Sequence, residues 1–97
     1  MSVVRTPRFL IANLGSEVSR LLDWKEKGDR ENAEKCLVRA HVILKQLSSA
    51  PEMKARGAEL SLLEDVIDDT VRESPKYEIR GDALKEYFYP FASRAFL

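Results

Sequence analysis

At residues 6–14 the chain reads TPRFLIANL, which carries the signals that begin an amphipathic helix. Thr6 is a residue type that caps helix N-termini, and Pro7 suits the first helical position, where its missing N–H costs nothing. We therefore predict a long helix from Pro7 to about Lys27. Its buried face is formed by apolar residues that recur at helical spacing, namely Leu10, Ile11, Leu14, Val18, Leu21 and Leu22.

A second helix is predicted directly after the first. Gly28 suits the position that follows a helix C-terminus, and Asp29 suits the N-cap of the next helix. So short a connection favours two antiparallel helices. The second helix would run from about Arg30 to Leu47. One apolar stripe follows it, made of Ala33, Cys36, Leu37, Ala40, Ile43, Leu44 and Leu47.

The remaining sequence predicts two more helices. Residues 51–56 fit either a turn or a short helix, and residues 59–73 fit a helix. Asp82 is a good N-cap for a last helix, which Pro90 should kink or end. The stripe of that helix is Leu84, Tyr87, Phe88, Phe91 and Ala95. We predict an all-α fold, an antiparallel up-and-down four-helix bundle, in a single domain over residues 1–97.

Composition argues against several classes of partner. The 97 residues carry sixteen basic and sixteen acidic side chains, so no basic excess indicates nucleic acid or an anionic membrane. No apolar run approaches membrane-spanning length, and the first residues lack the apolar core of a signal peptide. We therefore expect a cytoplasmic protein. Cys36 is the sole cysteine, which excludes an internal disulfide and a cysteine zinc site.

The sequence predicts no catalytic residue, no cofactor and no metal site. His41 is the sole histidine, and its sequence neighbours supply neither a carboxylate nor a nucleophile, so we interpret it as a surface or boundary residue. Cys36 lies in an apolar stripe and is interpreted as a small core residue. An acidic cluster could chelate a divalent ion if a second helix added carboxylates, but we interpret it as a solvated outer face. Its members are Glu64, Asp65, Asp68 and Asp69.

Several apolar residues fall off the inward stripes of their own helices. They are Phe9, Val42, Leu62, Tyr89 and Phe96. A single exposed apolar residue has no significance, but several together would provide a second apolar surface that accepts an amphipathic helix. We take Phe9, Val42 and Leu62 as the candidate contacts with a protein or peptide partner. The alternative is that a neighbouring helix or connection covers them.

Three segments resemble flagellar export chaperones that bind flagellin. The first is P-x-x-L-I-x-x-L at residues 7–14, followed by RLL at residues 20–22. The second is Gly28-Asp29, leading into LVRAHVILKQL at residues 37–47, which is similar to the second helix of that family. The third is similar to the junction and third helix of the family, and consists of Met53, Gly57, Glu59 and Leu60–Leu63.

This resemblance implies a cytoplasmic chaperone without ATP chemistry. Such a protein would hold the disordered C-terminal segment of flagellin while that segment folds as helices along apolar grooves, and would block filament assembly until export. Coupled folding suits this task, because it gives a large interface whose ordering cost keeps it releasable. The alternative from another class is a small helical-bundle homodimer with a regulatory or structural role, whose off-stripe residues form the dimer interface.

Overall fold

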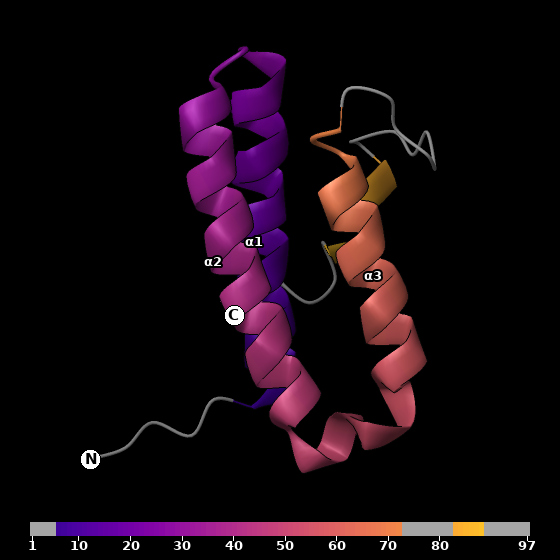
Figure 1. Cartoon of the computed structure of the whole chain (residues 1–97). Helices are drawn as coiled ribbons and strands as arrows, with labels where there is room; N and C mark the ends of the chain where they lie inside the picture. The colour runs from indigo at the N-terminus through magenta and orange to yellow at the C-terminus, as the bar shows by residue number, and fades with distance from the viewer. Residues whose placement is uncertain (1–5, 73–82, 89–97) are drawn as a thin grey trace, which may run out of the picture.

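The computed structural model describes residues 6–72 and 83–88, and in these ranges the chain forms helices and turns without a strand. The all-α prediction is therefore confirmed for the described residues. The predicted N-cap Asp82 and all residues from Tyr89 onward, including Pro90, lie outside them. The elements are α1 (Pro7–Glu26), α2 (Arg30–Ser49), the 3₁₀ helix η1 (Pro51–Arg56) and α3 (Gly57–Asp69) (Figure 1). Residues 83–88 form a further helical segment.

Side-chain caps fix where the first two helices begin. The Thr6 hydroxyl accepts a hydrogen bond of 3.2 Å from the backbone N–H of Phe9 at the start of α1. At the start of α2, the Asp29 carboxylate accepts from the backbone N–H of Asn32 at 3.1 Å and from its side-chain amide at 2.8 Å. Between the helices, Gly28 has a φ of +75°, which glycine adopts without strain. Both predicted caps are confirmed.

The α1 and α2 helices lie side by side and antiparallel (Figure 1). The small residues Ala33 and Ala40 of α2 are both buried in the hydrophobic core. The thiol of Cys36 is free and fully buried in the same core, which confirms its predicted place there. Large buried side chains complete the contact, namely Leu10, Leu14, Val18, Leu21, Leu44 and Leu47.

After η1, the α3 helix returns in the direction opposite to α2 (Figure 1). It begins and ends earlier than the predicted helix at residues 59–73. The early end has a local cause, because the Thr70 backbone N–H and hydroxyl both donate to the Ile67 carbonyl, at 3.2 and 2.7 Å. The next two N–H groups also bond three residues back, so the chain leaves the α-helix through a tighter turn.

Residues 83–88 pack against both α1 and α3. Phe88 is 2% exposed and lies against Gly15 in the middle of α1. Lys85 Nζ pairs with Asp23 Oδ1 of α1 at 2.6 Å. On the other side, the Tyr87 hydroxyl donates to Glu59 Oε1 of α3 at 3.3 Å. This segment therefore connects the first helix to the third.

Candidate functional site

Two of the three candidate contact residues lie around one groove. Phe9 of α1 and Val42 of α2 are 40% and 54% exposed, and both line a groove of about 450 Å³ between these helices. We call it the α1–α2 groove. Its lining residues are Phe9, Asn13, Ser16, Glu17, Arg20, Val38, Arg39, Val42, Ile43 and Gln46.

Leu62, the third candidate, lies in a different place. It is 55% exposed on α3 and lines a separate hollow of about 320 Å³ between α3 and residues 83–88. Tyr87 and Leu84 form the opposite wall of that hollow. The structure therefore brings Phe9 and Val42 together without Leu62, and the single apolar surface expected from the sequence is divided into two.

Val38 is a groove residue that the sequence analysis missed. It is 62% exposed and lines the α1–α2 groove with Val42. A signal for it was present, because positions 38 and 42 are one turn apart and share a helix face. The wheel that placed Val42 outside the apolar stripe of α2 would have placed Val38 there as well.

One end of the groove is charged. Glu17 is 8% exposed, and each of its carboxylate oxygens accepts a hydrogen bond of 2.9 Å from a different arginine, Arg20 or Arg39. A carboxylate so buried requires such partners. The hydrogen bond to Glu17 raises the pKa of the Arg39 guanidinium above its ordinary value. The groove thus combines exposed apolar side chains with two cations and one anion.

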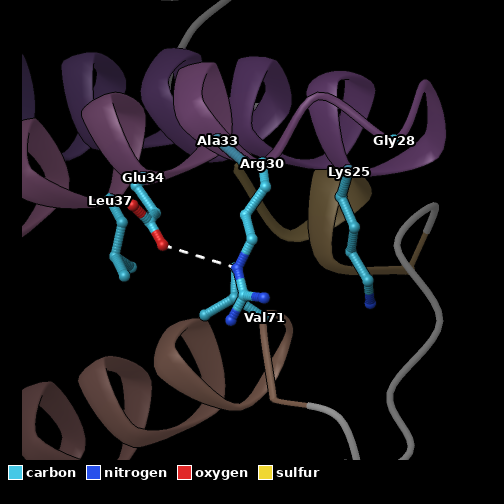
Figure 2. Close-up of a pocket in the computed structure, with 7 residues that line it drawn as sticks. All are labelled: Lys25, Gly28, Arg30, Ala33, Glu34, Leu37 and Val71. Atoms are coloured by element: carbon cyan, nitrogen blue, oxygen red, sulfur yellow. Dashed lines mark ion pairs between the residues drawn. The ribbon is translucent and has the colours of Figure 1, made fainter.

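A third hollow, of about 300 Å³, lies where α2 begins and α3 ends (Figure 2). Arg30 extends across it toward Val71, and its Nε pairs with Glu34 Oε1 at 3.5 Å. The Lys25 side chain extends separately and does not converge with Arg30 (Figure 2). Because Arg30 is already paired with Glu34 and the end of Lys25 lies apart from it, these residues do not form a focused anion site.

The acidic cluster is only partly a solvated face. Asp68 pairs with His41 Nε2 of α2, a partner twenty-seven positions away that no local pattern reveals. His41 is exposed, as predicted. The prediction for Asp69 was wrong, because this residue is 3% exposed and accepts a 2.9 Å hydrogen bond from Arg72. Its position near the end of α3 turns the carboxylate toward Arg72, where burial is compensated by the ion pair.

Among the described residues, no group of three or more histidine, cysteine, aspartate or glutamate side chains is arranged to hold a metal ion. Within the same ranges, no helix has the length and apolar character that crossing a bilayer requires. Comparison of the chain with protein-family models, curated proteins and solved structures finds no match. The geometry of the α1–α2 groove therefore provides the basis for a functional proposal.

Proposed function

We propose that this protein is a cytoplasmic, non-enzymatic binding protein that holds a helical segment of a protein partner in the α1–α2 groove. The observation that carries the proposal is the gathering of Phe9, Val38 and Val42, all exposed, around one groove. Exposed apolar side chains along a groove between two helices are a common receptor for the apolar face of an amphipathic helix.

The core of α1 and α2 does not include these three side chains. The interface of α1 and α2 is already filled by buried residues such as Leu14, Leu21 and Leu44. One exposed valine or phenylalanine would be ordinary on a protein surface, but several around a single groove indicate a place of contact. Binding a helix there would remove the three side chains from water.

The proposed partner is the C-terminal segment of flagellin, by resemblance to the flagellar export chaperones. Exposed grooves on a small helical scaffold suit a partner that folds as it binds. We also propose that residues 1–97 form one domain with the up-and-down order of a four-helix bundle. Support comes from the antiparallel α1 and α2, the returning α3, and the packing of Phe88 on α1.

Calorimetric titration of the full chain with a C-terminal flagellin peptide tests the partner. We expect saturable heat, a negative heat-capacity change from apolar burial, and a gain of helical circular dichroism. Val42→Ser should weaken binding about ten-fold or more, since it removes an apolar contact at the groove. No complex at high micromolar peptide would refute flagellin as the partner.

Leu62→Ser is the matched control, because Leu62 and Val42 are almost equally exposed but line different hollows. It should leave the affinity unchanged. Equal losses from both variants would show that the α1–α2 groove is not the specific site. Nucleic acid and membranes are not proposed as partners.

The competing occupant of the groove is a second copy of this chain. Light scattering over a wide concentration range separates the two cases. A monomer at high concentration supports the binding of another partner, whereas a dimer that Val42→Ser dissociates would favour the homodimer.

A further inference from the structure

We infer that the partner helix carries a carboxylate side chain, which Arg20 and Arg39 bind at the charged end of the α1–α2 groove. This inference rests on the proposed function and adds the chemistry that selects the partner. Two observations support this inference: the charge balance around Glu17, and the position of the two arginines relative to the apolar residues of the groove.

The two arginines share a single anion. Arg20 uses Nη1 to bond one oxygen of Glu17, and Arg39 uses Nε to bond the other. Arg39 Nη2 also lies 3.2 Å from the sulfur of Cys36. A guanidinium has five N–H donors, so these contacts leave donors on both side chains. Among the described residues that line the groove, Glu17 is the sole acidic one, so one positive charge is in excess there.

Burial of Glu17 fixes this charge in place. Its carboxylate holds both guanidinium groups at the groove wall before any partner arrives, which lowers the ordering cost of binding. A carboxylate of the partner would complete the charge balance and accept charge-assisted hydrogen bonds from the same arginines. A basic side chain at that position would instead meet two cations.

The spacing along α1 defines where the partner's acid must lie. Phe9 and Glu17 are eight residues apart on α1, so about 12 Å along the helix axis separate Phe9 from the charged end of the groove. A partner helix lying along the groove would therefore place its carboxylate about two turns from the apolar residue that contacts Phe9. The chain as a whole carries no excess of positive charge, which favours a discrete carboxylate over a polyanion.

Three synthetic amphipathic helical peptides test this inference. They share one apolar face and differ at a single position, two turns from the first apolar anchor, where they carry Glu, Gln or Lys. Fluorescence anisotropy of labelled peptides with the full chain should give the affinity order Glu, then Gln, then Lys. We expect a preference of about three- to five-fold for Glu over Gln, and a smaller preference at high salt.

Variants of this protein test whether the arginines cause the preference for the Glu peptide. Arg20→Gln should reduce the preference for Glu while Gln-peptide binding persists. Arg30→Gln is the matched control, since Arg30 is exposed and lies outside this groove, and it should leave the preference intact. Equal binding of the Glu and Gln peptides, or a preference for Glu that Arg20→Gln leaves unchanged, would overturn this inference and leave the α1–α2 groove as a site. Failure of all three peptides and of the flagellin peptide would overturn both proposals.

Discussion

Phe88 lies directly against Gly15, and the contact leaves no room for a side chain at position 15. A Cβ atom built on Gly15 would be 2.5 Å from the Cβ of Phe88 and 2.9 Å from its Cγ. These Phe88 atoms are close to its backbone and cannot move aside by a simple rotation. Gly15 therefore sets how closely residues 83–88 approach α1.

Gly15→Ala should destabilise the protein, although alanine favours helices. The gain in helix propensity is about 1 kcal/mol, whereas overpacking typically costs about 1–3 kcal/mol. We expect a net loss of unfolding free energy and weaker packing of Phe88. Urea denaturation, followed by the circular dichroism of the helices, measures the change.

Gly57→Ala is the matched control for this prediction. Gly57 begins α3, and nothing lies within 4 Å of a Cβ placed there. The same substitution should therefore be neutral or stabilising by up to about 1 kcal/mol. Equal effects at positions 15 and 57 would contradict the contact with Phe88.

The sequence predicts the structural features that depend on residues close together along the chain. Thr6 and Asp29 cap helices because their side chains bond N–H groups three residues ahead, and this spacing is visible in the sequence. The pair of Gly15 and Phe88 joins distant segments, and no local pattern reveals it. The same holds for Asp68 and His41, which contact each other across two helices.

The sequence predicts only part of the candidate site, because the packing of distant helices is not visible in local patterns. A helical wheel finds residues outside the buried stripe, such as Phe9 and Val42. It does not say which helices are neighbours, so it placed Leu62 on the same surface although α3 carries it elsewhere. The burial of Glu17 between two arginines also depends on the packing of α1 against α2.

The cap of α2 predicts a specific acid sensitivity. Hydrogen bonds from the backbone and then from the side chain of Asn32 lower the pKa of Asp29 below its ordinary value of 3.8. The folded protein therefore favours the ionised carboxylate. Its stabilising effect is complete above the unfolded pKa and is lost as the pH falls through the lower, folded pKa.

Asp29→Asn separates this titration from the cap itself, because asparagine keeps an oxygen acceptor and is an equally good N-cap. Melting temperatures of the two proteins should be similar at pH 7. Below pH 3.8 the wild-type melting temperature should fall further than that of the variant. Parallel curves down to pH 2 would contradict a role for the Asp29 charge.

Tyr87 predicts a corresponding effect at alkaline pH. Partial burial of the phenol, followed by the charge of Glu59, raises the pKa of Tyr87 above its ordinary value of 10.0. Subtracting the ultraviolet titration of Tyr87→Phe from that of the wild type isolates this tyrosine. Glu59→Gln should lower its pKa toward the ordinary value, since the neighbouring anion is removed.

The sign of the stability effect follows from the same shift. The folded state keeps the Tyr87 proton more tightly than the unfolded state, so stability is lost as the pH rises from about 10 through the raised pKa. Tyr87→Phe should remove this part of the alkaline loss. An unchanged alkaline unfolding curve would count against the raised pKa.

Phe9 and Val42 should matter little for folding if they serve a partner. Phe9→Ser and Val42→Ser are expected to change the unfolding free energy by no more than about 0.5 kcal/mol, as is usual for surface substitutions. Leu44→Ala, on the buried side of α2, should cost about 2–5 kcal/mol. Chemical denaturation of the three variants gives the comparison.

The comparison of unfolding free energies between these variants tests whether the α1–α2 groove is open to a partner. If the serine variants are as stable as the wild type, selection for folding does not explain apolar side chains at positions 9 and 42, and contact with a partner does. If instead they lose as much stability as Leu44→Ala, both side chains belong to the core of this protein. The α1–α2 groove would then be filled when the chain folds, and the proposed helix would have no place to bind.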